Sequence, residues 1–250
     1  MEDYKQVHPP ENNNTTTHWI TPAITIGGVI IVILMLVVLI LPVVQQARET
    51  SGAPKSKNNM KQIGLALHNY HDKHSIFPPG AIETTDGRPY HSWQTSILPF
   101  VDQNSLYNQI NFNKAWHDPA NQMIFQQKIR VYLNPSIQET APVNGYEISH
   151  YRGNELVLKK NNGFRIVDIK DSTPNTIMAM EIGENFKPWG DPTNITNPPN
   201  IIGSGKKTTY KGGYQVLMAD GSVRFISEDV DRAVLKALST PDGGEVLGEF

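Results

Sequence analysis

Ile24 to Leu41, which reads ITIGGVIIVILMLVVLIL, is apolar apart from Thr25, and no charged side chain occurs from Trp19 to Ala47. A helix needs about 20 apolar residues to cross about 30 Å of hydrocarbon. From Ile30 to Leu41 the apolar side chains cover every face of a helix, whereas a helix of a soluble protein keeps a polar stripe. We therefore expect a polar N-terminal tail over residues 1–18 and a single transmembrane helix over residues 19–44 that contacts the lipid bilayer.

A cleaved signal peptide is the alternative for this segment. It requires a basic start, an apolar stretch of about 7–15 residues and a small-residue cleavage site. The N-terminus instead carries three acidic residues and one lysine before Trp19, and the residues after Pro42 offer no such cleavage site. An uncleaved anchor explains the segment better.

The composition of the chain excludes several classes of partner and site. The chain has 250 residues, 22 Lys and Arg against 24 Asp and Glu, and no cysteine. A net charge of -2 argues against nucleic acid as a partner. The lack of cysteine excludes a disulfide framework, thiolate metal sites and a cysteine nucleophile.

Residues 45–250 are long enough for one soluble domain with a single core. The region 43–75 is expected to continue the helix, with Gly52-Ala53-Pro54 as a candidate break. At 100° per residue one side of this helix forms a packing stripe, which comprises Met60, Ile63, Gly64, Leu67, Tyr70, His71 and His74. Phe77-Pro78-Pro79-Gly80 is expected to end it.

Shorter elements follow. Short helices are expected at Trp93–Phe100, Ser105–Ile110, Pro119–Lys128 and Asp229–Leu238, and strands at Arg130–Leu133, Thr176–Glu181, Tyr214–Ala219 and Ser222–Ile226. Asp220-Gly221 between two strands predicts a hairpin with a type I′ turn, in which both central residues have positive φ. Residues 184–213 are rich in Pro, Gly and Asn and are expected to form a long surface loop. A long N-terminal helix packed on an antiparallel sheet, with long loops, is an α+β arrangement like that of pilins.

Several runs resemble the prepilin-like family of planctomycete bacteria, whose shared region is domain of unknown function 1559. They are the runs from Leu41 to Glu49, from Lys57 to Asp72, at Phe77–Gly80, from Asp168 to Glu181, from Gly212 to Ile226 and from Gly243 to Phe250. The signature positions are His68, Asn69, Tyr70, His71, Asp72, Pro78, Pro79, Gly80, Asn175, Thr176, Glu181, Gly212, Gly213, Asp220 and Gly221. The resemblance implies a pilin-like fold.

The chain departs from the family pattern in three places. No Gly-Phe junction and no acidic fifth helix residue occur between Trp19 and Gly28, so a prepilin peptidase is not expected to process the chain. Tyr210 stands where the family has the His of its H-x9-D-G segment. Ser56 and Asn134 stand where relatives often carry cysteines, and we hypothesise that those two cysteines form a disulfide in the relatives.

The sequence offers few candidates for chemistry. His68, His71 and His74 recur every third residue, but a helix turns the third away from the first, so we expect packing roles rather than a metal site. Asp220-Gly221 lacks the ligand spacing of an EF-hand calcium loop. Trp93, Trp116 and Trp189 could line a sugar or peptide cleft, and Trp189, Trp93 and Tyr210 are the candidate ligand-binding residues. No catalytic constellation and no cofactor motif is present, so we do not expect an enzyme.

Two functions are compatible with these features. The first is a membrane-anchored, pilin-like or pseudopilin-like structural or assembly protein of the cell envelope, which contacts itself or other envelope proteins. The second is a membrane-tethered extracytoplasmic module that binds a solute or glycan through residues 184–213. The resemblance places the large domain outside the cytoplasmic membrane. Arg48, Lys55, Lys57 and Lys61 after the span favour the opposite orientation, but large domains translocate largely regardless of charge.

Overall fold

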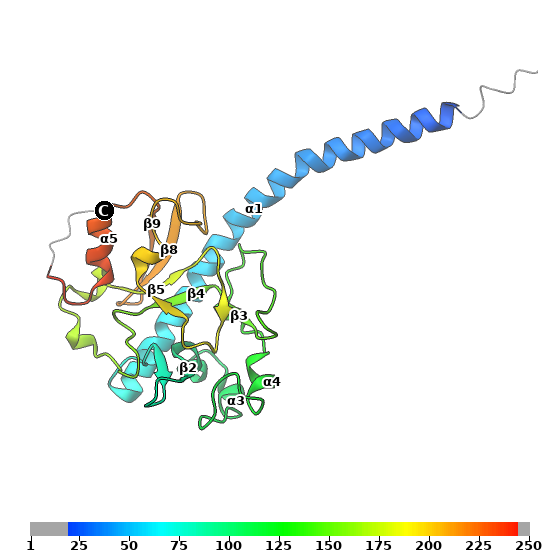
Figure 1. The fold of residues 1–250 in the computed structure, drawn as a ribbon. Helices are drawn as coiled ribbons and strands as arrows, with labels where there is room; N and C mark the ends of the chain where they lie inside the picture. Colours follow the sequence, from blue (N-terminus) through cyan, green and yellow to red (C-terminus); the bar gives the residue numbers. More distant parts are fainter. Residues whose placement is uncertain (1–19, 245–250) are drawn as a thin grey trace, which may run out of the picture. The chain divides into compact units, whose positions relative to one another are not determined.

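The computed structural model describes residues 20–244, and within the first helix it describes the side chains of residues 34–38 and 52–74. The chain divides into two compact units, Met1–Arg48 and Glu49–Phe250. One helix of 55 residues, α1 (Ile20–His74), belongs to both of them (Figure 1). The expected tail, 1–18, lies outside the described residues, as do most side chains of the expected span, 19–44. Among the residues described, no helix has both the length and the apolar character needed to cross a membrane.

The C-terminal part of α1 buries the stripe that the sequence predicts. Met60, Ile63 and Leu67 are each 1% exposed, whereas Leu65, between them on the opposite side, is 62% exposed. The stripe ends earlier than expected, because His74 is exposed at the last helical residue. The helix stops just before Phe77-Pro78-Pro79-Gly80, as predicted.

Gly52-Ala53-Pro54 does not break α1. The helix runs through these residues because tertiary contacts hold it at Gly52 and at Ala53. Gly52 packs so closely on Ser136 that a Cβ there would clash with it. The side-chain amide of Gln215 donates a hydrogen bond to the Ala53 carbonyl at 3.1 Å. Packing therefore overrides the local effect of Pro54 on the residue before it.

A five-stranded sheet forms the centre of the second unit, in the order β7-β4-β5-β8-β9. Its strands are β4 (Tyr151–Asn154), β5 (Ile177–Glu181), β7 (Ile195–Thr196), β8 (Gly213–Met218) and β9 (Val223–Ser227). Strands β5, β8 and β9 confirm the predicted strands in the second half of the chain. The sheet is mixed rather than wholly antiparallel, because β7 pairs with β4 in parallel at one edge. The chain reaches that edge through the 189–194 segment, which the sequence could only describe as loop.

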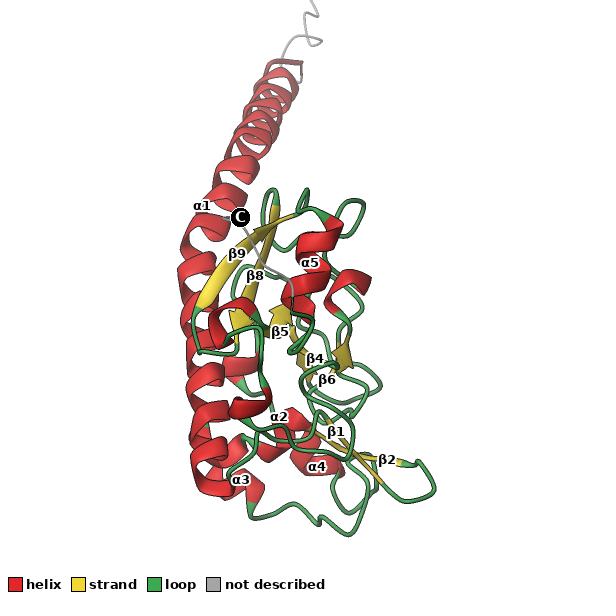
Figure 2. Cartoon of the chain, turned by 90° about the vertical axis from the view of Figure 1, so that its left-hand side faces the viewer, coloured by secondary structure: helices red, strands yellow, loops and turns green. Residues whose placement is uncertain are grey.

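The two faces of the sheet bury different sets of side chains. Along β8, Leu217 joins the core that contains Ile63 and Leu67 of α1. Its neighbours Val216 and Met218 instead join a second core, together with Leu235 and Leu238 of α5 (Arg232–Ser239). This alternation follows from the two-residue period of a strand. Helix α1 therefore covers one face and α5 the other (Figure 2).

The β8–β9 hairpin has a different turn from the one predicted. Gly221 has φ +83°, but Asp220 is not among the residues with positive φ. The Gly221 amide bonds to the Met218 carbonyl at 3.0 Å, and the Met218 amide bonds to the Ser222 carbonyl at 2.8 Å. This pattern fits a type I turn followed by a glycine bulge. The Asp220 carboxylate accepts from the Ser222 amide at 2.8 Å, which favours this form.

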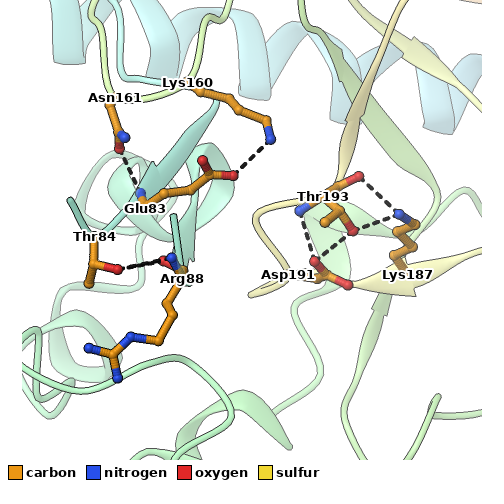
Figure 3. Close-up of polar contacts among 8 residues, drawn as sticks. All are labelled: Glu83, Thr84, Arg88, Lys160, Asn161, Lys187, Asp191 and Thr193. Carbon is orange, nitrogen blue, oxygen red and sulfur yellow. Dashed lines mark hydrogen bonds and ion pairs between the residues drawn. The ribbon is translucent and has the colours of Figure 1, made fainter. Parts of the chain in front are cut away.

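The remaining elements are short. They comprise two small sheets, β1 (Ala81–Glu83) with β2 (Pro89–Ser92) and β3 (Ile148–Ser149) with β6 (Lys187–Pro188), and the helices α2 (Trp93–Ser96), α3 (Asn104–Tyr107) and α4 (Gln122–Phe125). An ion pair of 2.8 Å between Lys160 and Glu83 ties β1 to a distant loop (Figure 3). The predicted strand at Arg130–Leu133 is wrong, because Arg130–Tyr132 forms a 3-10 helix. There the Tyr132 hydroxyl is buried and donates to the Gln94 carbonyl at 2.8 Å.

Candidate functional site

A buried carboxyl group lies between α1 and the sheet. Glu181, the last residue of β5, is fully buried, and one of its oxygens accepts hydrogen bonds from the Ser56 hydroxyl and, at 3.2 Å, from the Tyr210 hydroxyl. The Tyr151 and Ser56 hydroxyls are 2.7 Å apart. The Asn134 amide donates to Tyr210 at 3.0 Å. We call these five residues the Glu181 cluster.

Burial controls the protonation of this cluster. Desolvation raises the pKa of Glu181 to about 7, although hydrogen bonds from Ser56 and Tyr210 oppose the rise. Its second carboxylate oxygen, Oε2, has no hydrogen-bond partner. Burial also raises the pKa of Tyr151 and Tyr210, and the neighbouring Glu181 charge adds to both shifts. Near neutral pH the carboxyl is thus about half protonated, and both phenols are neutral.

The cluster connects segments that are far apart in the sequence. Around Ser56, α1 runs along residues 133–136: Gly52 packs on Ser136, and the Asn59 side chain donates to the Leu133 carbonyl at 2.8 Å. Ser56 and Asn134 therefore lie in one cluster, joined through Tyr210 and Glu181. If Ser56 and Asn134 lay at opposite ends of the domain, the hypothesis that relatives carry a disulfide between these two positions would be contradicted.

Other signature residues occupy separate structural positions. His68 and His71 pack against Phe77, with ring centroids 5.4 and 4.8 Å away, and His74 lies against Tyr70 at 4.3 Å. His68 and His71 thus share Phe77 as a neighbour, whereas His74 lies at Tyr70, and no group of three metal-ligating side chains occurs among the side chains that the structure describes. The contacts of His68 and His71 agree with the packing role that the sequence predicts, whereas His74 is exposed.

Two signature glycines sit where backbones come close together. A Cβ on Gly80 would clash with the Leu158 carbonyl oxygen, and a Cβ on Gly213 would clash with that of Ile226. Gly212 and Gly221 have φ of +85° and +83°, which glycine adopts at little cost. The remaining signature side chains are split between the surface and the core: Asn69 and Asp72 are exposed, Pro78 and Thr176 are buried, and Pro79 and Asn175 are partly buried.

The tryptophans do not form an open cleft. Trp93 and Trp189 are fully buried, and their indole N–H groups bond to the carbonyls of Asn194 and Gln127. Trp189 packs on Phe125 with ring centroids 4.4 Å apart, and the partly buried Trp116 packs on Tyr146 at 4.8 Å. Trp93 and Trp189 therefore belong to the core, where a sugar or peptide cannot reach them. Tyr210, the third candidate, belongs to the Glu181 cluster.

Comparison with known proteins identifies the family. The family described as "Protein of unknown function (DUF1559)" matches residues 45–209. The chain belongs to this family. The match confirms the resemblance to domain of unknown function 1559 and includes four members of the Glu181 cluster, with Tyr210 directly after its end. No curated protein and no solved structure matches this DUF1559 chain.

Sequence reasoning found part of the cluster. Glu181 was identified as a signature position, Tyr210 as a departure and candidate ligand contact, and Ser56 and Asn134 as positions of replaced cysteines. Tyr151 was missed, because nothing in the run Tyr151–Asn154 distinguishes a tyrosine that faces a carboxyl from any core aromatic residue. The one sequence signal that could have grouped these residues was that Ser56, Asn134 and Tyr210 all depart from the family pattern.

Proposed function

We propose that this chain is a single-pass, membrane-anchored structural protein of the cell envelope, in which α1 carries a pilin-like α+β domain. The observation that carries the proposal is an exposed apolar segment of α1. Leu34, Met35, Leu36, Val37 and Val38 are 59, 62, 50, 47 and 68% exposed. Because five consecutive residues exceed one helical turn, apolar side chains are exposed on every face. An exposed apolar surface of this kind marks a partner or a membrane.

A lipid bilayer is the partner that the sequence favours. The exposed residues lie within the uncharged run from Trp19 to Ala47. A protein partner would cover one face of the helix, whereas hydrocarbon covers all faces equally. Residues 19–44 are thus proposed as the anchor.

Contacts in the second unit favour a role for α1 as the support of the soluble domain. The same helix that contains residues 34–38 buries Met60, Ile63 and Leu67 in the domain core and is bonded to the sheet through the Glu181 cluster. Pilin-like proteins use such a helix to hold the domain at a membrane surface. We propose that the domain lies outside the cytoplasmic membrane and contacts other copies or other envelope proteins. The proposal assigns it no catalytic step.

The test uses the full chain with a C-terminal tag, expressed in a bacterium. After alkaline carbonate extraction the chain should remain in the membrane pellet. Protease added to intact spheroplasts should remove the tag, while a cytoplasmic marker stays intact. Release by carbonate would refute the anchor, and a protected tag in sealed spheroplasts would refute the orientation alone.

The alternative, a tethered solute- or glycan-binding module, loses its expected aromatic cleft because Trp93 and Trp189 are buried. One separate observation favours solute binding that does not need an aromatic cleft. It is a cationic cavity at the loops after β5.

A further inference from the structure

Arg152 of β4 is a buried cation with incomplete hydrogen bonding. It is 9% exposed and lies next to Tyr151, so its side chain leaves the sheet on the face opposite α1. One guanidinium N–H donates to the Asn185 carbonyl, but its Nε has no partner. Among the carboxylate side chains that the structure describes, none forms an ion pair with Arg152. Burial lowers the pKa of this guanidinium. A buried cation of this kind is costly unless an anion or further acceptors approach it.

A small cavity adjoins this guanidinium. It has a volume of about 160 Å³ and is lined by Arg152, by the segment Ile182–Asn185, by Asn200 and Ile201, and by Lys206 and Lys207. Gly183 brings the two loops together, since a Cβ there would clash with the Lys207 carbonyl oxygen. The cavity thus lies where the loop after β5 meets the 200–207 loop.

Positive charge predominates around the cavity. Lys206 and Lys207 are exposed, and no described carboxylate is within ion-pair distance of either. Lys187 lies near Arg152. Burial is the main cause of the lowered pKa of Lys187, and the Arg152 charge lowers it further. Two carboxylates oppose this charge: Glu184 lines the cavity, and Asp191 interacts with both Arg152 and Lys187.

The two carboxylates offset only part of the positive charge, because four cationic side chains, Arg152, Lys187, Lys206 and Lys207, stand against two anionic ones. Asp191 accepts hydrogen bonds from the amide and hydroxyl of Thr193 at 2.8 and 2.7 Å, and Lys187 donates to that same hydroxyl at 2.6 Å (Figure 3). Asp191 is thus held at Thr193, and Glu184 is exposed to solvent, as are Lys206 and Lys207. The lining of the cavity itself carries three cationic groups, Arg152, Lys206 and Lys207, and one anionic group, Glu184, so its net charge is positive.

We propose that this cavity binds the oxyanion group of a small soluble solute, namely a phosphate, sulfate or carboxylate. A guanidinium presents a planar fork of donors to such groups, and two ammonium groups add charge. The volume is below the roughly 300 Å³ at which pockets for drug-sized ligands begin, so the group that enters is small. The site does not depend on the membrane anchor, because all of these residues belong to the second unit.

The experiment is isothermal titration of the full chain in non-ionic detergent with inorganic phosphate, sulfate and succinate. At least one of these anions should bind saturably at millimolar concentrations or below, and added salt should weaken the binding. Arg152→Met should weaken it by about tenfold or more, since hydrogen bonds to charged groups are lost. The double variant Lys206→Gln and Lys207→Gln should weaken it severalfold.

The matched control is Lys236→Gln, an exposed lysine of α5 that does not line the cavity, and its affinity should equal that of the unmodified chain. If Arg152→Met does not fold, the exposed double-lysine variant decides the outcome alone. No binding of any of the three anions, or equal binding by the double variant, would overturn the proposal. Binding of phosphatidic acid in mixed micelles without binding of a soluble anion would overturn the assignment to a soluble solute.

Discussion

At the residue scale, Glu181 couples the stability of the domain to pH. Its pKa in the folded chain is about 7, above the ordinary value of 4.5. Between these values the unfolded chain releases the proton while the folded chain retains it, so stability falls as pH rises from about 4.5 to about 7. A shift of this size corresponds to about 3 kcal/mol. Burial lowers the pKa of His91 and His150 to about 4, and these two residues act in the opposite direction.

Glu181→Gln isolates this contribution, since the amide is neutral at every pH. The unfolding free energy of the variant, relative to that of the unmodified chain, should rise by about 2–3 kcal/mol from pH 5 to pH 8. Urea unfolding followed by the fluorescence of buried Trp93 and Trp189 measures it. The control is Glu155→Gln at an exposed site, which should show no such gain. Parallel pH profiles for Glu181→Gln and the unmodified chain would contradict the buried carboxyl.

Ser56 and Asn134 allow a second prediction at this scale. Because Gly52 and Asn59 hold α1 against residues 133–136, the double variant Ser56→Cys and Asn134→Cys should form a disulfide under oxidising conditions. Mass spectrometry of the peptides after digestion measures it. The control pair, Ser56→Cys with an exposed Ser204→Cys, should remain reduced. Free thiols in both pairs would argue against a bridge in the relatives.

At the element scale, α1 separates a buried face from an exposed one. Leu67→Ala should destabilise the domain by about 2–5 kcal/mol, because it leaves a cavity where the side chain is 1% exposed. Leu65→Ala removes the same atoms from a side chain that is 62% exposed and should change stability by less than about 0.5 kcal/mol. Thermal or urea unfolding compares the two. Equal losses would mean that α1 packs on the domain through another face.

The sequence predicted those elements that local signals define. The stripe on α1 follows from helical periodicity, and the β8–β9 hairpin follows from Asp220-Gly221 between two apolar runs. The type of turn was wrong because a carboxylate-to-amide bond at Asp220 selects a different backbone form. The prediction of a strand at Arg130–Leu133 was wrong, because the Tyr132 hydroxyl bonds to the carbonyl of Gln94, which lies in a remote segment of the sequence.

The candidate sites were largely beyond local prediction. Ser56 and Glu181 are separated by 125 positions in the sequence, so no window contains both. Arg152 and Lys207 meet only because the loops around Gly183 come together. The family pattern singled out Glu181 and Tyr210, but it could not say that they share a hydrogen bond.

At the scale of the whole molecule, retention in the membrane should depend on residues 34–38. Leu36→Lys with Val37→Lys should shift the full chain from the carbonate-resistant pellet toward the soluble or aggregated fraction. Each lysine costs about 3 kcal/mol at the centre of a membrane helix. Leu65→Lys, in the second unit, should leave retention unchanged. Retention of both variants would refute residues 34–38 as the anchor.

The position of α1 at the start of the chain also affects biosynthesis. The ribosome makes Ile63 and Leu67 about 150 residues before Leu217, the strand residue in the same core. At about 5–20 residues per second, this interval is on the order of ten seconds. During that time the apolar stripe has no sheet to cover it. The nascent chain is thus exposed to misfolding longest at this helix, and a chaperone would protect the stripe by covering it until the sheet is made.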